Sequence, residues 1–230
     1  MVPWLDVDND LDPFPSLHCA LEEPNGLLAA GGSLRPERLL NAYQQGIFPW
    51  FEDDQPILWW SPNPRMVLKP NEIHISRSLK KTINKDIYTC TIDNAFNDVI
   101  LACSETRHQQ HGTWITASMI DAYNALFKLG HAHSIEVWSD DLLVGGLYGI
   151  SIGQVFFGES MFSRQSDTSK VAFAYLCQQL EQWNYQLIDC QVASPHLVSL
   201  GASTMSRIEF SQKLNTLCSK HCATMAWQTI

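Results

Sequence analysis

Two stretches of the sequence carry side chains that suit acid–base chemistry. Residues 156–163 form an apolar, aromatic-rich run whose only carboxylate is Glu159, and residues 187–192 contain Asp189 and Gln191. Because side chains alternate along a strand, period 2 places Asp189 and Gln191 on one face. A buried carboxylate beside an amide can orient the amide or polarise it towards a reacting amine. A purely structural hydrogen bond between the two side chains is the alternative.

Glu159 needs a partner, because an unpaired carboxylate in an apolar site is energetically costly. The same alternation puts Phe157, Glu159 and Met161 on one face of a strand and Phe156 on the other. Gly158 can carry a β-bulge that changes these faces. A salt bridge inside a sheet is the alternative to a functional role for Glu159. The residues of the neighbouring elements must decide between these two roles.

Apolar residues of the elements expected beside Glu159 can wall a pocket. Leu147, Phe156 and Ile188 belong to three predicted strands, and Phe173 belongs to a predicted helix. Ordinary core packing would use the same residue types. The pattern alone therefore leaves both interpretations open.

Aromatic residues are dense between residues 47 and 60, where proline turns interrupt the chain. So short a segment cannot bury them all, and we expect Trp50 to be exposed while Trp59 and Trp60 form a small core. An exposed indole beside basic residues is what a nucleobase-stacking platform requires. Six basic residues lie between Arg65 and Lys85 against Glu72 alone, although the formal net charge of the chain is −9. This segment predicts a local basic surface, either a partner site or a solvated helix face.

The 230 residues, 45% of them apolar, are sufficient for one large domain or for a small domain joined to a larger one. Seven scattered cysteines argue against a disulfide framework and favour a reducing compartment, and no run is long and apolar enough for a membrane helix. We expect residues 26–32 to form a turn, because this glycine-rich run lacks the Lys-Ser/Thr of a phosphate loop. Ser33 is expected to cap a helix that ends at Gly46.

The periodicity from residue 66 onwards predicts an α+β fold with one central mixed sheet. Strands are expected over 66–68, 88–92, 132–138, 142–148, 154–162 and 186–192, and helices over 76–85, 95–103, 117–129, 169–183 and near 211–218. Pro62 and Pro64 mark the expected boundary between a small N-terminal domain, 1–62, and a catalytic domain, 63–230.

A set of motifs resembles those of the leucyl/phenylalanyl-tRNA–protein transferase family, in the family's order. They are NGLLA (25–29), QGIFPWF (45–51), LWWSP (58–62), HISRS (74–78), GTWIT (112–116), GHAHSIEVW (130–138), GESMFS (158–163) and LIDCQ (187–191). The resemblance covers the chain from about residue 22 to about residue 205. The tail beyond it matches no motif.

The resemblance implies a C-terminal domain of the acyl-CoA N-acyltransferase type. It also implies an aminoacyltransferase that moves Leu or Phe, and Met less well, from aminoacyl-tRNA to a protein's N-terminal Arg or Lys. The product would carry an N-end rule degradation signal. Aminolysis of an activated ester needs no metal or other cofactor. We expect a cytoplasmic enzyme whose partners are aminoacyl-tRNA and acceptor proteins, with no role for DNA or a membrane.

The resemblance also implies roles for individual residues. Trp50 and Trp114 would hold the terminal adenine of the tRNA. From the chemistry of the reaction, we expect Asp189, acting through Gln191, to assist removal of a proton from the acceptor amine, and Glu159 to bind an ammonium or the acceptor's basic side chain. The amino-acid pocket would be formed by Leu147, Phe156, Phe173, Leu176 and Ile188. The acceptor stem would be gripped by Arg77, Lys80, Lys81 and Lys85.

The chain departs from the family pattern where Asn84 interrupts the basic run and where Leu176 and Leu180 replace common aromatics. The leucines leave the preference between Leu and Phe open.

Three other classes of protein remain as alternatives. An acetyltransferase would need a glycine-rich loop for coenzyme A, and Asp167 would repel its phosphates. A metal hydrolase would use His131 and His133 with His108 or His111, and a tRNA-binding module would not need Asp189.

Overall fold

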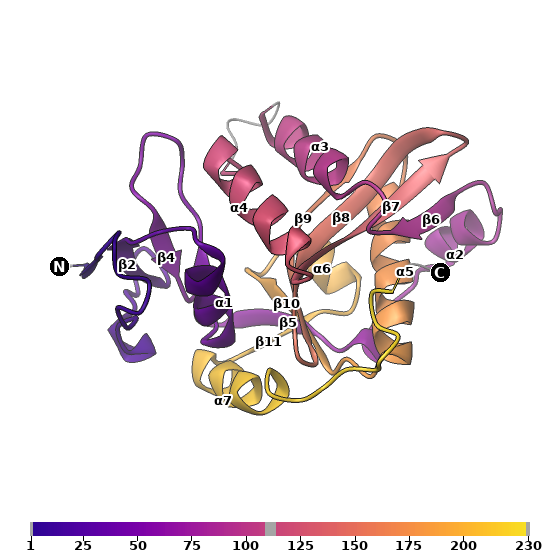
Figure 1. Ribbon diagram of the computed structural model, residues 1–230. Helices are drawn as coiled ribbons and strands as arrows, with labels where there is room; N and C mark the ends of the chain where they lie inside the picture. The colour runs from indigo at the N-terminus through magenta and orange to yellow at the C-terminus, as the bar shows by residue number, and fades with distance from the viewer. Residues whose placement is uncertain (1, 109–113, 229–230) are drawn as a thin grey trace.

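The computed structural model describes residues 2–108 and 114–228, with the side chains of 106–108 excepted. Within this part the strands form two sheets (Figure 1). The first sheet has the order β1-β2-β4-β3. Its strands are β1 (Trp4–Leu5), β2 (Leu27–Gly31), β3 (Phe48–Pro49) and β4 (Leu58–Trp60).

The second sheet has the order β11-β5-β10-β9-β8-β7-β6. Its strands are β5 (Arg65–Leu68), β6 (Thr89–Ile92), β7 (Ala132–Ser139), β8 (Leu142–Ile152), β9 (Val155–Ser163), β10 (Leu187–Gln191) and β11 (Ser203–Met205). Neighbouring strands run antiparallel except β9 and β10, which are parallel. The sheet is therefore mixed, and the predicted α+β class is confirmed.

Helices cover both faces of the second sheet (Figure 1). The helices of the described residues are α1 (Pro36–Gln44), α2 (Arg77–Ile83), α3 (Phe96–His108), α4 (Ala117–Lys128), α5 (Thr168–Gln182), α6 (Pro195–Ser199) and α7 (Arg207–Leu217), with 3-10 turns η1 (Leu17–Cys19) and η2 (Pro70–Glu72). One apolar cluster joins α3 and α4 to the sheet, and α5 packs in a second cluster with Phe156 and Ile188. Among the described residues no helix is long and apolar enough to cross a membrane.

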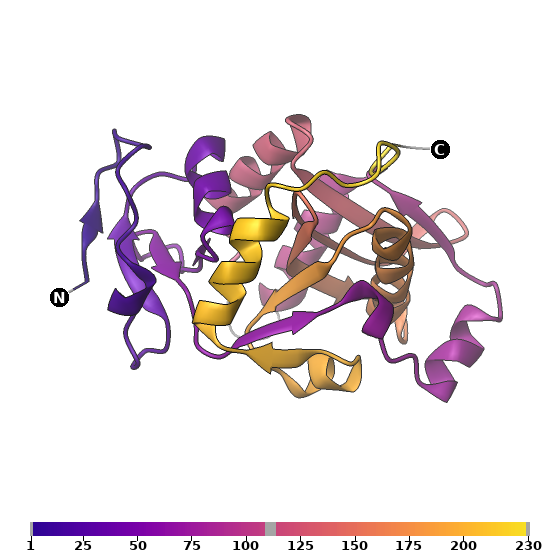
Figure 2. The same ribbon diagram turned by 90° about the horizontal axis from the view of Figure 1, so that it is seen from below.

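The first apolar cluster also joins the two sheets. It contains Leu28 and Trp59 of the first sheet, Phe157 of the second, and Phe210 of α7. Figure 2 shows α7, in yellow, lying between the two sheets. The chain changes from one sheet to the other between Trp60 and Arg65, next to the expected boundary at Pro62. The division into two domains stays a prediction.

Two local expectations were wrong. Residues 27–31, expected to be a turn, form β2, which pairs with β1 on one side and β4 on the other. Pairing with both neighbours outweighs the weak strand propensity of this Gly- and Ala-rich run. Ser33 does not cap α1, because the helix begins three residues later, at Pro36, with Arg35 at the N-cap position. The Ser33 hydroxyl instead bonds Asp10 of the N-terminal arm.

A β-bulge lies at Glu159. Strand β8 pairs Tyr148 with Ser160 and then Gly149 with Gly158, so Glu159 is the extra residue of β9. The bulge reverses the faces predicted beyond Glu159, and Met161 packs against the cluster around α5. The alternation of a regular strand is interrupted because the bulge adds one residue without a partner.

A second irregularity lies beside the first, in β10. The pairing with β5 passes from Asp189 to Gln191 and skips Cys190, and Gln191 adopts a left-handed φ of 60°. The parallel pairing of β9 with β10 ends at Asp189 and Phe157. The two strands thus stop pairing just before Glu159 and Gln191, which allows these side chains to project into the space between them.

Candidate active site

A cavity of about 420 Å³ opens where β9 and β10 stop pairing. Its wall comes from β3, β8, β9, β10, α5, α6 and the segment between β10 and α6. One end is apolar and contains all the residues that the sequence predicted for the amino-acid pocket. They are Leu147, Phe156, Phe173, Leu176 and Ile188. The structure brings these five side chains together, while their role stays a prediction.

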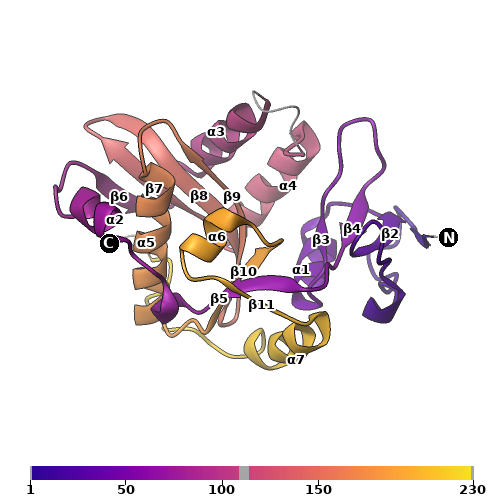
Figure 3. The ribbon, with the colours of Figure 1, turned by 180° about the vertical axis from the view of Figure 1, so that it is seen from behind.

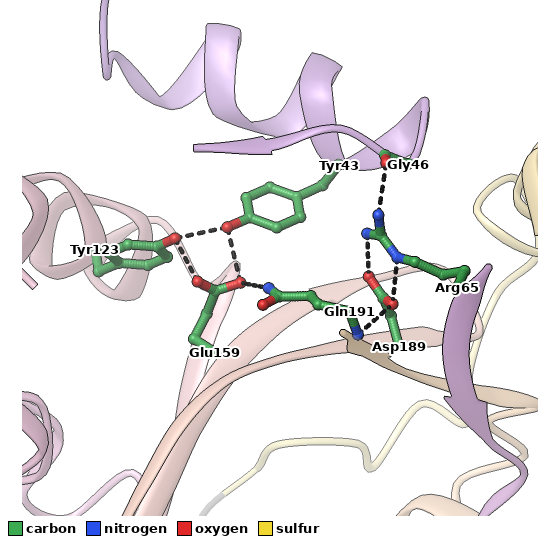
Figure 4. A network of polar contacts seen from close by, with 7 residues as sticks. All are labelled: Tyr43, Gly46, Arg65, Tyr123, Glu159, Asp189 and Gln191. Atoms are coloured by element: carbon green, nitrogen blue, oxygen red, sulfur yellow. Dashed lines mark hydrogen bonds and ion pairs between the residues drawn. The ribbon is translucent and has the colours of Figure 1, made fainter. Parts of the chain in front are cut away.

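The polar end of the cavity is built around Glu159 (Figure 4). The Tyr43 hydroxyl donates to Glu159 Oε1 at 2.8 Å, and the Tyr123 hydroxyl donates to Oε2 at 2.7 Å. The Gln191 amide donates from Nε2 to Oε1 at 2.9 Å. The two tyrosine oxygens are 2.6 Å apart. Helices α1 and α4 therefore hold the carboxylate from one side, and β10 holds it from the other.

Burial raises the pKa of Glu159 to about 7. Hydrogen bonds from Tyr123 and Tyr43 lower this pKa, the charge of Asp189 raises it, and that of Arg65 lowers it. The pKa values of Tyr43 and Tyr123 are also raised, first by burial and second by the charge of Glu159. Both phenols therefore keep their protons. Near neutral pH the Glu159 carboxyl is divided between its protonated and ionised forms. A group with this property suits proton transfer.

Asp189 is fully buried and forms a two-point ion pair with Arg65 (Figure 4). Arg65 donates from Nε to Oδ1 at 2.8 Å and from Nη2 to Oδ2 at 2.6 Å, and its Nη1 donates to the Gly46 carbonyl at 3.0 Å. Its guanidinium carbon lies 4.8 Å from the centre of the Phe48 ring and 4.7 Å from that of Phe210. Arg65 thus connects the N-terminal segment, β10 and α7.

The link between Asp189 and Gln191 differs from the prediction. The backbone N–H of Gln191, and not its side-chain amide, donates to Asp189 Oδ1 at 2.9 Å. The amide reaches Glu159 instead, because the irregularity at Cys190 removes the simple alternation along β10. Arg65, expected to belong to the basic surface, is buried and neutralised by Asp189.

Trp50 and Trp114 both line the cavity. Trp50 is 45% exposed, as expected, and Trp59 is fully buried. The Trp60 ring lies 5.5 Å from the Trp50 ring, and its Nε1 donates to the Trp50 carbonyl at 2.7 Å. Trp114 is half-buried and packs against the core beside α4. An aromatic surface therefore borders the cavity, while the part that each indole plays stays a prediction.

The predicted tRNA-binding side chains lie on and just after α2. Arg77, Lys80, Lys81 and Lys85 are all exposed, and the buried Leu79 anchors the helix. Ser76 caps the helix by accepting a hydrogen bond from the Leu79 N–H at 3.2 Å. Figure 3 shows α2 at the opposite end of the molecule from the first sheet. Contact with these residues therefore requires a ligand that extends well beyond the cavity.

Comparison with known proteins decides the family. The model described as leucyl/phenylalanyl-tRNA protein transferase matches residues 67–215, and the model of its N-terminal domain matches residues 32–63. The chain belongs to the leucyl/phenylalanyl-tRNA protein transferase family. A leucyl/phenylalanyl-tRNA–protein transferase from Cellvibrio japonicus is 57% identical over 93% of this chain and 90% of its own length. One from Nitrosospira multiformis is 56% identical over 94% and 92%.

Solved structures similar to this family member are distant. L-PGS from Bacillus licheniformis is 11% identical, with a TM-score of 0.41 over 73% of this chain and 53% of that one. A GCN5-related N-acetyltransferase from Kribbella flavida is 12% identical, with a TM-score of 0.37 over 74% and 61%. Likeness at this level carries no information about substrate.

Of the histidines considered for a metal hydrolase, His133 has other contacts. His133 Nδ1 lies 2.7 Å from Asp93 Oδ2, and its ring stacks on Trp227. The side chain of His108, and His111 altogether, lie outside the described residues. In residues 2–108 and 114–228 no three His, Cys, Asp or Glu side chains are grouped as a metal ion would need.

Sequence reasoning missed three members of the polar end, namely Tyr43, Tyr123 and Arg65. The tyrosines lie on helices far apart in the sequence, and no local pattern distinguishes them from core residues. Arg65 could have been sought, because a buried Asp189 requires a positive partner. Several basic residues follow Arg65, however, and the sequence does not show which of them turns inward.

Proposed function

We propose that the protein transfers Leu or Phe, and Met less well, from aminoacyl-tRNA to the N-terminal Arg or Lys of acceptor proteins. The observation that carries this proposal is a cavity with an apolar end, a titratable carboxylate at its polar end and an exposed indole at its border. Membership of the transferase family supplies the substrate class. The new N-terminal residue marks the acceptor for N-end rule degradation, and we infer that the enzyme acts in the cytoplasm.

The reaction forms one amide bond and breaks one ester bond. The lone pair of the acceptor α-amine attacks the aminoacyl carbonyl, and the ribose oxygen of the tRNA departs with the proton that the amine gives up. An α-amine has a pKa of about 8, so part of it is neutral at pH 7. The protein must therefore bind the two substrates, orient the amine towards the carbonyl and assist the removal of one proton.

Leu147, Phe156, Phe173, Leu176 and Ile188 receive the Leu or Phe side chain in this proposal. An apolar cavity rejects polar side chains through desolvation and discriminates only modestly by size, which suits the acceptance of both residues. Trp50 and Trp114 hold the terminal adenine by stacking. Arg77, Lys80, Lys81 and Lys85 bind backbone phosphates and so do not read the sequence of the tRNA.

Gln191 positions the acceptor amine through its amide oxygen, since its Nε2 is already donated to Glu159. Ionised Glu159 polarises that amide, accepts the proton that the amine gives up and passes it to the departing ribose oxygen. This pathway replaces the one expected from the sequence, in which Asp189 acts through Gln191, because Arg65 occupies both oxygens of Asp189. We assign Asp189 to positioning, as it fixes the Gln191 backbone.

The function is tested with purified protein, radiolabelled Leu-tRNA and a peptide that begins with Arg. We expect label in this peptide and none in a matched peptide that begins with Ala. A second arm replaces Leu-tRNA with acetyl-CoA. Transfer of acetyl but not of Leu would contradict the proposal and favour an acetyltransferase.

Trp50→Ala should weaken binding of a short aminoacyl-adenosine mimic by about 5- to 150-fold, because stacking on one base contributes roughly 1–3 kcal/mol. Calorimetry or fluorescence quenching measures the dissociation constant. Trp4→Ala is the matched control, since Trp4 is 69% exposed on β1 and does not line the cavity. Equal affinities of the Trp50 variant and the unmodified protein would exclude a stacking role.

The double variant Lys80→Ala/Lys81→Ala should bind aminoacyl-tRNA more weakly and with a smaller salt dependence. The slope of log K against log [salt] is negative, and its magnitude should decrease by about 1–2, since each phosphate contact contributes about 0.9 in a duplex. Filter binding at several salt concentrations measures this slope. Lys128→Ala, at the exposed end of α4, is the control and should leave it unchanged. An unaltered slope in the α2 variant would place the tRNA elsewhere.

A further inference from the structure

The C-terminal tail, residues 218–228, lies outside the region matched by the family model, which ends at residue 215. It nevertheless packs against the second sheet and runs beside α5 (Figure 1). The Ala223 N–H donates to the Trp183 carbonyl at 3.0 Å, and Gln154 Nε2 donates to the His221 carbonyl at 3.0 Å. Two separate parts of the catalytic region thus hold the tail in place.

Trp227 is the tail residue that reaches the sheet. Its ring lies 5.6 Å from the ring of Phe156 at an interplanar angle of 26°, and 4.0 Å from the ring of His133 at 10°. Its Nε1 donates to the Tyr185 hydroxyl at 2.7 Å. The hydrogen bond fixes the indole so that it stacks on Phe156.

Phe156 is also a wall of the cavity. Trp227 is not among the lining residues, so it supports Phe156 from outside the cavity. Gly149 on β8 allows this arrangement, because a Cβ there would lie 2.6 Å from Phe156 Cζ. The Phe156 ring therefore lies close over the β8 backbone and is stacked on the indole.

We propose that Trp227 is a positioning residue for amino-acid specificity, which fixes the depth of the apolar cavity by holding Phe156 in place. The inference rests on the proposed transfer of Leu and Phe. With the indole present, Phe156 cannot move outward, because close-packed interiors leave no room for such displacement. Without the indole, the ring can rotate into the vacated space and lengthen the cavity. A longer cavity favours the larger Phe side chain over Leu.

The experiment compares Trp227→Ala with the unmodified enzyme in a competition assay with Phe-tRNA and Leu-tRNA. We expect the ratio of kcat/KM for Phe to that for Leu to rise about tenfold, a change of the size that one or two methylene groups produce in an apolar pocket. Trp227→Phe retains a stacked ring and should bring the ratio back to within about twofold of the original. Met225→Ala is the control, because Met225 lies on the same tail and is 65% exposed.

Thermal denaturation shows whether each variant is folded. If Trp227→Ala does not fold, Trp227→Leu leaves a smaller void and should raise the ratio by about threefold. A folded variant with an unchanged or lower ratio, even with reduced total activity, overturns the inference. Failure of the unmodified protein to transfer either amino acid would instead overturn the proposed function.

Discussion

Arg65→Met should lower the free energy of unfolding by about 3–5 kcal/mol, because removing one partner of a buried ion pair leaves an uncompensated charge. Asp189 and Arg65 are both fully buried. The variant also leaves the Gly46 carbonyl without its donor and removes the cation from between Phe48 and Phe210. Urea denaturation followed by circular dichroism measures the loss.

The matched comparison is the double variant Arg65→Met/Asp189→Leu. It removes both charges, so we expect it to recover most of the lost stability. A second control is Arg164→Met, which breaks an exposed pair with Glu105 and should cost less than about 1 kcal/mol. If Arg65→Met were as stable as the unmodified protein, the ion pair would have no structural importance. Transfer activity should stay low in the double variant, since Gln191 loses its link to Asp189.

Glu159→Gln should lower kcat for transfer by about 100- to 10,000-fold, the range typical of a general acid–base group. Glutamine is close to Glu159 in size and retains hydrogen-bonding capacity towards Tyr43 and Tyr123, but it cannot accept the proton. Binding of the aminoacyl-adenosine mimic should change little, because Trp50 and the apolar end are untouched. Single-turnover transfer at fixed pH measures the effect.

The pH dependence separates Glu159 from the substrate. In the unmodified enzyme the rate should rise as Glu159 loses its proton at a pKa of about 7, and again as the acceptor amine becomes neutral. The glutamine variant should retain only the inflection that belongs to the amine, at a pKa of about 8. Persistence of the lower inflection in the variant would assign it to another group.

The sequence predicted most of the helices and strands after residue 66 because their apolar periodicity is regular. Its errors are concentrated where local pattern and tertiary contact disagree. Residues 27–31 form a strand only because β1 and β4 pair with them. The pocket residues were found from the elements expected beside Glu159 and from the resemblance to the family.

The polar end was less accessible to sequence reasoning. Alternation along a strand failed at Glu159 and at Cys190, where a single extra residue changes the direction of all that follow. It therefore gave the wrong partner for the Gln191 amide. The tyrosines that bond Glu159 come from two helices, and their convergence depends on packing that no short segment encodes.

The position of Arg65 has a consequence for synthesis on the ribosome. One of the two rings that cover its guanidinium is Phe210, close to the end of the chain. While α7 of a nascent chain is still inside the exit tunnel, one face of the Arg65 guanidinium would be open to water. Asp189 would then lack part of the support that Arg65 gives it. We therefore expect catalytic competence only after α7 has emerged, and translation products that stop before Phe210 should be inert.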